Sequence, residues 1–351
     1  MKFLLYGANG YTAQLIIEMA QDFGLEPVLA GRSEVKIKPL AQQYGLSYQI
    51  ADLADTAALE ALLQSFTVVL HCAGPFAHTA LPMQQACLRT GTHYLDITGE
   101  IAVFEQGMRL HAQAKQAGVM LMSGTGFDVV PTDCMALFLK QQLPNANHLQ
   151  LAFMTKGGNI SHGTAKTAVE SLGLPGYVRA NGQLKEVPSA HKTLQVPFED
   201  QRLTTCMAIP WGDISTAYYT TQIPNIETFM AVPSSAIWAA KLGNYMGGLL
   251  QSSFVQKQIH HYLDQKLTGP STAARMAAHT LVWGKVRNEQ GKSLTARLRC
   301  PEGYTLTAWM ALHITKKVLN GHVEAGYQTP AKLYGADLVL EMPGTQRVLI
   351  S

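Results

Sequence analysis

The chain has 351 residues, 47% of them hydrophobic, and its formal charge is only +3 because 27 Lys and Arg residues are offset by 24 Asp and Glu residues. A chain of this length and composition can bury a large core and is expected to form two domains. Neither sign of charge is gathered into a long block, so the sequence gives no indication of nucleic-acid binding, and the slight positive excess does not oppose an anionic cofactor.

The five cysteines are far apart and include no C-x-x-C pair, which favours reduced thiols in the cytoplasm over a zinc site or a disulfide framework. They are Cys72, Cys87, Cys134, Cys206 and Cys300.

The start "MKFLLYGANG" reaches glycine too early for a signal peptide. The most apolar internal stretch, "AIWAAKLGNYMGGLL" (236–250), is shorter than the ~20 residues of a membrane span, so we expect no transmembrane segment and leave a membrane-surface role open.

Strands and helices are predicted to alternate over the first 130 residues. "KFLLY" (2–6) is a short apolar run ended by glycine, typical of a strand buried on both faces of a parallel sheet. The next segment (12–24) places Leu15, Ile16 and Met19 on one helical face and ends at Gly24. The pattern continues with the strands "EPVLAGR", "YQIADL", "TVVLHCAG", "HYLDITGE" and "VMLMSGTG" and the helices "VKIKPLAQQYG", "DTAALEALLQSF", "LPMQQACLRTG" and "FEQGMRLHAQAKQAG". About six such units predict an α/β domain with a Rossmann-type, doubly wound parallel sheet.

From about residue 131 the alternation stops. The short β-rich runs there are "HLQLAFMT", "TLQVPF", "RLTTCMAI", "STAYYTTQI" and "ETFMAV". A helix-like "GTAKTAVESLG" interrupts them, and 280–300 reads as a hairpin with "NEQGK" as its turn. We expect a second α+β domain with a mostly antiparallel sheet. The predicted division is 1–130 for nucleotide binding, 131–304 for substrate and dimerisation, and 305–351 as a helical segment that returns to the first domain.

The stretch "GANGYTA" (7–13) follows the first strand and precedes the first helix. In that position Gly7 allows a sharp turn, Gly10 allows the backbone to approach a pyrophosphate at the helix start, and Ala13 allows close packing. The spacing G-x-x-G-x-x-A is more common among enzymes that use NADP. The turn is predicted to contribute Gly7, Asn9, Gly10, Tyr11 and Thr12 to the cofactor site; the alternative is a plain strand-to-helix turn.

The end of the second strand, "LAGRS", carries no acidic residue, although NAD enzymes place one there for the ribose hydroxyls. Arg32 can pair with a 2′-phosphate and Ser33 can offer a hydroxyl, so we predict NADP, with a solvated surface arginine as the alternative. Asp52 and Leu53, just past the third strand, are placed to flank the adenine; the alternative is a free aspartate on the surface.

The fourth strand ends in "HCAGPFA" (71–77), a loop with glycine and proline. We expect it to lie against the nicotinamide ribose; an ordinary strand-ending turn is the alternative. The residues predicted to contact the cofactor there are Ala73, Gly74, Pro75 and Phe76.

Together, "GANGYTA", "LAGRS", "HCAGPF", "GTHYLDITGE" and "GFDVVPTD" resemble the saccharopine dehydrogenase-like oxidoreductases, in particular the branch that includes trans-acting enoyl reductases. The resemblance covers residues 1 to about 135 and continues more thinly through "SHGTAKT" (161–167) and "GYQTPAKLYGAD" (326–337). It implies a Rossmann domain that carries NADP(H), a second domain with a mostly antiparallel sheet, and a homodimer. It implies no single substrate, because members include amino-acid dehydrogenases, polyamine-forming enzymes and enoyl reductases. Ala13 and Val129 depart from the family pattern, and Val129 replaces a small polar residue.

Four weak catalytic candidates remain for hydride transfer to or from a C=N or activated C=C bond. They are Asp96, Glu100, Asp128 and His162. Asp96 and Glu100 read equally well as helix caps, and a lone histidine is more often structural. Lys156 and Lys166 flank the His162 loop and offer charge for an anionic substrate, whereas the Y-x-x-x-K spacing of Tyr262 and Lys266 is read as chance because it lies far from the expected strand-helix junction.

The sequence therefore predicts an NADP(H)-dependent oxidoreductase that acts on a small-molecule, amino-acid-like or acyl substrate and holds no metal. Two alternatives stay open: a non-catalytic NADP-binding sensor or scaffold, and a trans-acting enoyl reductase that needs an acyl-carrier partner.

Overall fold

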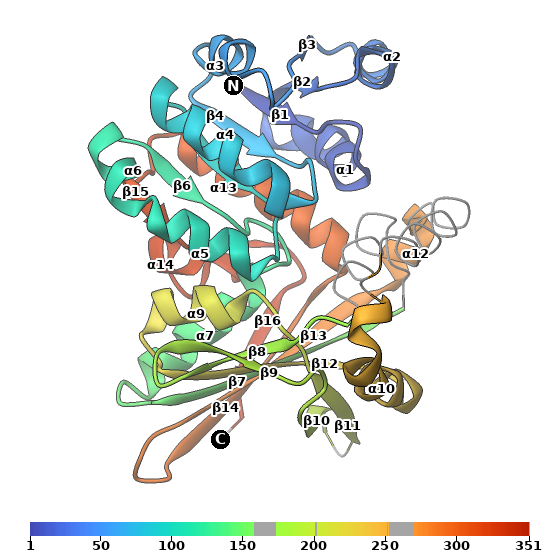
Figure 1. The fold of residues 1–351 in the computed structure, drawn as a ribbon, viewed down its shortest axis with the longest axis vertical. Helices are drawn as coiled ribbons and strands as arrows, with labels where there is room; N and C mark the ends of the chain where they lie inside the picture. The colour runs from blue at the N-terminus through green and yellow to red at the C-terminus, as the bar shows by residue number, and fades with distance from the viewer. Residues whose placement is uncertain (158–172, 201, 251, 253–269, 351) are drawn as a thin grey trace. The chain divides into compact units, whose positions relative to one another are not determined.

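The computed structural model describes residues 1–157, 173–200, 202–250, 252 and 270–350, and Figure 1 shows its ribbon. The chain divides into two compact units. The first comprises Met1–Val130 and Tyr304–Gly335, and the second comprises Pro131–Gly303 and Ala336–Ser351. The sequence assigned 305–351 to one segment that returns to the first domain; in the structure, the part from Ala336 onward clusters with the second unit, because β16 (Gln346–Leu349) pairs with β14 (Ser293–Pro301).

The first unit is built on a seven-stranded sheet in the order β15-β6-β5-β4-β1-β2-β3, and all of its strand pairs are parallel. The strands are β1 (Lys2–Tyr6), β2 (Glu26–Gly31), β3 (Tyr48–Ile50), β4 (Val68–His71), β5 (His93–Asp96), β6 (Met120–Met122) and β15 (Gly326–Gln328). The order 3-2-1-4-5-6, read from the β3 edge, confirms the Rossmann-type prediction.

Helices cover both faces of this sheet because its strands are apolar on both sides; Phe3, Leu4 and Leu5 of β1, for example, are fully buried. The helices and the short 3-10 turn η1 are α1 (Tyr11–Ala20), η1 (Gln21–Phe23), α2 (Glu34–Tyr44), α3 (Thr56–Leu63), α4 (Phe76–Thr90), α5 (Ile101–Arg109), α6 (His111–Ala117), α13 (Gly303–Leu319) and α14 (Pro330–Tyr334). Helix α4 packs against α3, α5 and α6, whereas α1 and η1 lie beside α13 through ring contacts such as Phe23 with Trp309. In Figure 1, α4 and α5 lie in front of the sheet and α13 lies behind it.

The described part of the second unit contains a nine-stranded sheet, and among its described strands only β7 and β12 pair in parallel. Its strands are β7 (His148–Lys156), β8 (Gly176–Ala180), β9 (Gln183–Val187), β10 (Thr193–Glu199), β11 (Arg202–Ala208), β12 (Asn225–Ala231), β13 (His279–Arg287), β14 and β16. The helices and the 3-10 turn among its described residues are α7 (Val130–Gln142), α9 (Asp213–Thr221), α10 (Ser234–Leu250), α12 (Thr272–Ala277) and η2 (Leu338–Glu341). The mostly antiparallel sheet is as predicted, and β13 and β14 form the expected hairpin.

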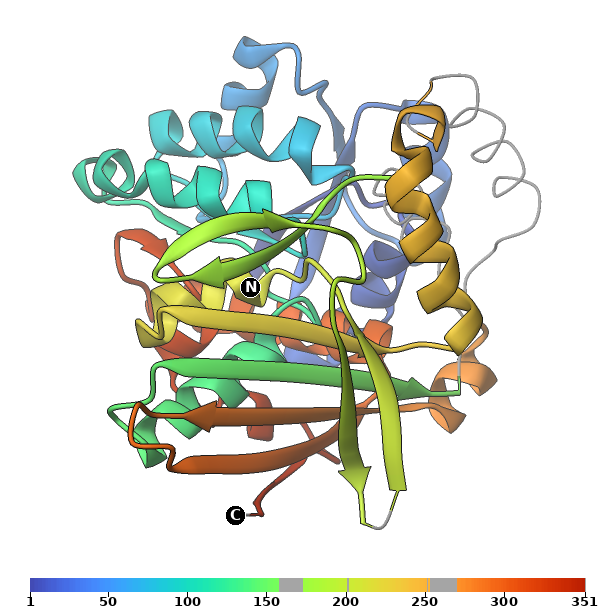
Figure 2. The same cartoon turned by 60° about the horizontal axis from the view of Figure 1, so that its bottom comes forward.

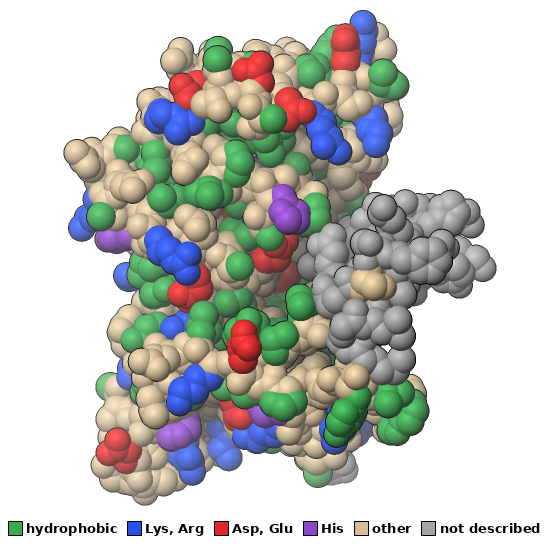
Figure 3. Space-filling view, viewed as in Figure 1, with side chains coloured by type: hydrophobic (Ala, Val, Ile, Leu, Met, Phe, Trp, Pro, Cys, Tyr) green, Lys and Arg blue, Asp and Glu red, His purple; other side chains and the backbone are tan. Residues whose placement is uncertain are grey.

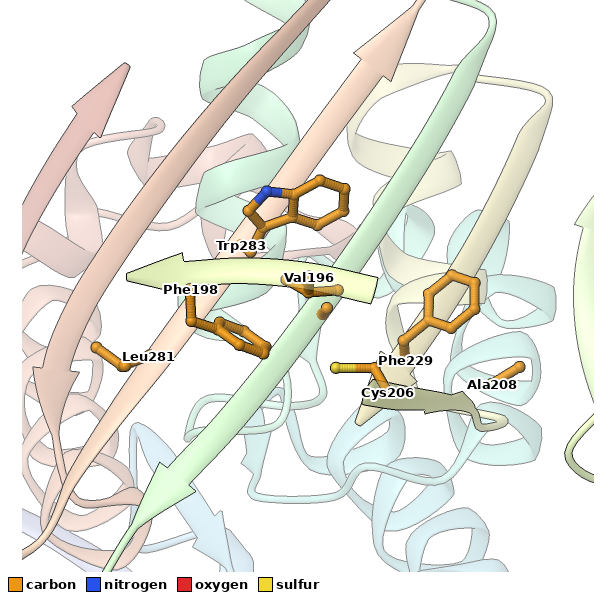
Figure 4. Packing of buried hydrophobic residues seen from close by; sticks show 8 residues of the cluster. Val196, Phe198, Cys206, Ala208, Phe229, Leu281 and Trp283 are labelled. Atoms are coloured by element: carbon orange, nitrogen blue, oxygen red, sulfur yellow. The ribbon is translucent and has the colours of Figure 1, made fainter. Parts of the chain in front are cut away.

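The β10–β11 hairpin folds over one face of this sheet and closes a core there (Figure 2). Figure 4 shows side chains of that core, which comes from β7, β10, β11, β12 and β13 and consists of Ala152, Val196, Phe198, Cys206, Ala208, Phe229, Leu281 and Trp283. Arg297 on β14 fastens the hairpin by donating from Nε to Pro197 O and from Nη1 to Asp200 Oδ1, both at 2.6 Å. The opposite face is covered by α7, whose Met135 packs so closely on the sheet that a Cβ at Gly284 would lie 2.7 Å from Met135 Cγ.

One predicted strand was wrong. The run "STAYYTTQI" lies largely in helix α9, which ends when Gln222 adopts a left-handed φ of 58°. Its Tyr and Thr residues favour strands, but Ile214, Ala217 and Thr221 recur at helical spacing and are buried, so tertiary packing overrides local propensity. The expected helix "GTAKTAVESLG" falls almost entirely outside the described residues.

Surface charge is mixed. Figure 3 shows Lys and Arg side chains interspersed with Asp and Glu on the face that it displays. All five cysteines are among the described residues and form no disulfide. None of the helices in the described part of the chain combines the length and apolar character that a bilayer crossing requires.

Candidate cofactor and active site

The carboxyl ends of the central strands of the first unit line up at one edge of the sheet. Tyr6 of β1 is in register with Ala30 of β2 and His71 of β4, and His71 is in register with Asp96 of β5. The segments that follow these strands carry the cofactor candidates of the sequence and, with the segment after β6, the catalytic candidates Asp96, Glu100 and Asp128. Ligands of open α/β sheets bind at this edge, where the strand order reverses between β1 and β4.

Gly7 forms a turn that no other residue fits. Its φ is +83°, and a Cβ atom there would lie 2.6 Å from Ala73 N. The amides of Gly7 and Ala8 both donate to Ala30 O, at 2.8 and 3.1 Å, and Gly10 N donates to Gly7 O at 3.0 Å. The turn is therefore closed by the protein's own backbone and pressed against the loop that follows β4.

Gly10 is different, because nothing inside the unit requires glycine there. Its φ of −72° is ordinary, and a Cβ would meet no atom closer than 3.4 Å. It precedes α1, which begins at Tyr11 without a side-chain cap and without an acidic residue in its first turn. The positive end of a helix dipole and the space left by the missing side chain fit a pyrophosphate. Ala13 is fully buried, as close packing requires, whereas Asn9 is exposed and Thr12 is half-buried.

Arg32 lies directly after β2 with its side chain exposed and forms no ion pair or hydrogen bond within the described parts of the chain. Ser33 follows as the N-cap residue of α2, and its hydroxyl makes no capping bond. The first acidic side chain, Glu34, is engaged elsewhere, since it accepts from Tyr48 Oη at 3.1 Å and pairs with Lys38 at 3.5 Å. The cation and hydroxyl at this strand end thus fit a 2′-phosphate.

Asp52 is exposed, and its Oδ1 accepts from Ala54 N at 2.9 Å. It lies near Tyr6, whose hydroxyl donates to Ala51 O at 2.9 Å. Burial and, to a lesser extent, the Asp52 charge raise the pKa of Tyr6 to about 12, while Arg32 acts in the opposite direction. Asp52 and Arg32 therefore both lie near the Tyr6 hydroxyl. Leu53 is half-buried beside them in sequence.

Glu100 caps a helix, although not the helix that it precedes. Its two carboxylate oxygens accept from Phe76 N at 2.8 Å and Ala77 N at 2.7 Å, the first amides of α4. It makes no side-chain cap to α5, which starts one residue later. The negative charge therefore stabilises the start of α4 and fixes the end of the Ala73–Phe76 loop.

Asp96 is buried, and its carboxylate connects the segment after β5 to the segment after β6. Its Oδ2 accepts from Tyr94 Oη at 2.7 Å and Ser123 Oγ at 2.8 Å, and its Oδ1 accepts from the amides of Thr98 at 3.0 Å and Gly124 at 2.9 Å. Burial raises its pKa to about 6 despite these hydrogen bonds. With two donors on each oxygen, Asp96 ties the segment after β5 to that after β6 and has no acceptor left for a substrate.

Asp128 has the opposite surroundings. Its Oδ1 is buried without a hydrogen-bond partner in the described structure, and a Cβ at Gly99 would lie 2.5 Å from its Oδ2. Burial raises the pKa of Asp128 to about 7. The backbone beside it is fixed, since Phe127 N donates to Thr307 Oγ1 at 3.0 Å and Val129 N donates to Gly124 O at 3.2 Å. Of the acidic candidates, Asp128 is the one suited to exchange a proton near neutral pH.

The remaining candidates do not join this site. His162, Lys166, Tyr262 and Lys266 lie outside the described residues. Lys156 ends β7 in the second unit and forms an ion pair with Glu199. In the described part of the chain, no group of His, Cys, Asp and Glu side chains has the arrangement of a metal site.

Three residues at the carboxyl-terminal edge of the first sheet were not predicted from the sequence to belong to the site. Gly99 makes room for the Asp128 carboxyl, and His71 and Thr79 contact each other beside the loop after β4. The available signals were a histidine that ends an apolar strand and a threonine one turn into the next helix.

Residues 3–122 match the sequence profile of the family described as "Saccharopine dehydrogenase NADP binding domain". Over these residues the first unit is similar to saccharopine dehydrogenase NADP-binding domains. The match confirms the family resemblance and the NADP prediction for this domain, and it includes Gly7, Gly10, Arg32 and the loop after β4.

The chain spans about half or less of the length of the curated relatives that it matches. It is 31% identical over 215 residues to the saccharopine dehydrogenase-like oxidoreductase of Rattus norvegicus, a match that covers 53% of this chain and 50% of the relative. It is 35% identical over 138 residues to the trans-acting enoyl reductase of Mycobacterium leprae, covering 37% and 33% of the two chains. Among solved structures, apo saccharopine dehydrogenase (L-Glu forming) from Saccharomyces cerevisiae is similar with a TM-score of 0.66 over 100% of both chains, at 13% identity, which shows a shared fold.

Proposed function

We propose that this protein is an NADP(H)-dependent oxidoreductase that transfers a hydride to or from a C=N or activated C=C bond of an amino-acid-like or acyl substrate. The observation that carries the proposal is the uncapped start of α1 behind the Gly7 turn, with Arg32 at the next strand end. The residues proposed to hold the cofactor are Gly7, Asn9, Gly10, Tyr11, Thr12, Arg32, Ser33, Asp52, Leu53, Ala73, Gly74, Pro75 and Phe76.

The bound cofactor supplies or accepts the hydride, so the protein has to bind it, orient it and handle one proton. We assign the proton to Asp128. Its carboxyl is partly buried, lies at the ligand edge of the sheet and is half-protonated near neutral pH, because burial raises its pKa to about 7. In the reductive direction the protonated Asp128 donates to the substrate atom next to the one that receives the hydride; in the oxidative direction its carboxylate accepts that proton. Asp96 and Glu100 support the segments around it.

Hydride consumption tests the proposal. NADPH absorbance is followed with three substrate classes: 2-oxo acids mixed with amino acids, preformed imines, and enoyl thioesters. We expect NADPH oxidation with at least one class and a loss of ~10²-fold or more in Asp128→Asn, since general acid-base groups contribute that order. Full activity in Asp128→Asn would remove Asp128 from the mechanism.

Two alternatives stay in view. The similarity to a trans-acting enoyl reductase favours an enzyme that acts only when an acyl carrier presents the substrate, which predicts NADPH oxidation with carrier-bound enoyl groups and none with the free thioester. A non-catalytic sensor binds NADPH and oxidises it with none of these substrates. A homodimer and a cytoplasmic location are part of the proposal, and sedimentation and cell fractionation would test them.

A further inference from the structure

The loop that follows β4 is held from two sides. On one side it touches the Gly7 turn, since a Cβ at Gly7 would lie 2.8 Å from Ala73 Cα. On the other side, the Thr79 hydroxyl lies 2.6 Å from Ala73 O and 3.1 Å from Pro75 O. Thr79 sits in the first turn of α4, so its short side chain reaches back to the two carbonyls that precede the helix.

His71 completes a chain of hydrogen bonds to this loop. It is fully buried as the last residue of β4, and its Nε2 lies 3.1 Å from Thr79 Oγ1. Its ring is packed at 5.5 Å from the rings of both Tyr6 and Phe76. Burial lowers the pKa of His71 to about 3, so the ring is neutral and carries one proton.

The position of that proton follows from the donors and acceptors. Thr79 has one hydroxyl proton, and the carbonyl oxygen of Ala73 can only accept, so Thr79 donates to it and must accept from His71. The proton of His71 is therefore on Nε2. Its Nδ1, buried without a hydrogen-bond partner among the described residues, is then a bare lone pair rather than an unsatisfied N–H group.

The hydrogen-bond chain from His71 through Thr79 to Ala73 O also fixes the direction of the Gly74 N–H group. The Ala73–Gly74 peptide bond is trans, so its N–H points away from the side to which its C=O points. Because the Ala73 carbonyl faces Thr79, the Gly74 N–H faces the other way, on an exposed residue that has no hydrogen bond to the described chain. The loop thus presents one oriented backbone donor next to the Gly7 turn.

We propose that His71 and Thr79 are positioning residues for the nicotinamide half of the cofactor: their hydrogen-bond chain locks the Ala73–Gly74 peptide so that the Gly74 N–H donates to an oxygen of that half. The inference rests on the proposed NADP(H) function. In this proposal the two side chains do not touch the cofactor. They align its reactive end relative to the pyrophosphate turn.

The test compares two ligands in the full-length protein. NADPH contains the nicotinamide half, whereas 2′,5′-ADP retains the adenine and the 2′-phosphate and lacks it. We expect Thr79→Val to bind NADPH ~10-fold more weakly, the cost of about one lost hydrogen bond, and to bind 2′,5′-ADP as the wild type does. Thr79→Ser should restore NADPH binding. Thr90→Val is the matched control, because Thr90 lies on the same helix and donates to Ala86 O at 3.0 Å, away from the loop.

His71→Phe keeps the aromatic packing and removes the donor. We expect the same selective loss for NADPH and no further loss when it is combined with Thr79→Val, because both changes break one chain. Should Thr79→Val not fold, Thr79→Ala and His71→Phe give the same comparison.

An equal loss for both ligands, or no loss for either, would overturn the positioning role while leaving the proposed cofactor intact. If the wild type binds neither ligand, the proposed function fails, and this inference fails with it.

Discussion

Replacing Asp128 by Asn should make the protein more stable, by an amount that depends on pH. Burial without a hydrogen bond on Oδ1 raises the pKa of this carboxyl from 3.8 to about 7, whereas the unfolded chain ionises near the ordinary value. Between these values the folded state holds a proton that the unfolded state has released, so the free energy of unfolding falls as pH rises, by up to ~1.4 kcal/mol per pH unit. The full range amounts to ~4 kcal/mol. Since Asp128 is only partly buried, we expect about half of this change in the free energy of unfolding.

Asn has nearly the shape of the protonated acid and does not titrate. The stability gain of Asp128→Asn over the wild type should therefore grow from pH 4 to about pH 7 and stay constant above that value. The gain is measured by urea unfolding of both full-length proteins at pH 5, 6, 7 and 8. The transition that belongs to the first unit is the one that moves to higher urea concentration when 2′,5′-ADP is added, because a ligand stabilises the unit that binds it. A difference that does not change with pH, or a wild type that gains on the variant as pH rises, would refute the burial argument for Asp128.

Three further substitutions test the surrounding geometry in the same unfolding assay. At pH 8, where the Asp96 carboxylate is ionised, Asp96→Asn should lose ~2 kcal/mol or more, because the amide nitrogen would face donors that a carboxylate oxygen now accepts from; an unchanged unfolding midpoint at that pH would contradict the structural role of Asp96. Glu100→Gln should lose ~1 kcal/mol, since the amide nitrogen that replaces one carboxylate oxygen cannot accept from the Phe76 or Ala77 amide, and the negative charge at the start of α4 is lost. Gly7→Ala should lose ~1–3 kcal/mol through its positive φ and its overlap with Ala73, and its NADPH binding, measured by titration, should disappear; retained binding would speak against the turn.

Much of the first unit followed from sequence because its signals are local and mutually consistent. The apolar strands, the glycines that end the helices and the alternation of the two determine a parallel sheet, and the register of that sheet brings Asp96 and the strand ends that precede Gly7 and Arg32 to one edge. Which acid would be catalytic did not follow. Asp96 ends one apolar strand and Asp128 follows another, and only the count of donors around each carboxyl separates the satisfied one from the unsatisfied one.

The second unit was harder to predict because its elements depend on distant packing. The run "STAYYTTQI" forms a helix against strand preference, since its apolar positions are buried on one helical side. The β8–β9 hairpin was missed although Asn181 and Gly182, both with positive φ, form the Asn-Gly turn typical of such hairpins. Glu100 was foreseen as a cap, but its partner α4 starts 24 residues earlier in the chain, so the identity of the capped helix was not readable from local sequence.

NADP(H) is proposed to bind at the sheet edge formed by the Gly7 turn and Arg32. The most direct test is the dissociation constants of NADPH and NADH, measured by fluorescence titration for the wild type and for Arg32→Ala, with Arg89→Ala, an arginine of α4 paired with Glu60, as the matched control. We expect the wild type to prefer NADPH. Arg32→Ala should weaken NADPH binding by ~10-fold or more through loss of a charge-assisted contact, and NADH binding should hardly change. Equal affinity of the wild type for the two cofactors, or an Arg32→Ala variant that binds NADPH as tightly as the wild type, would contradict it.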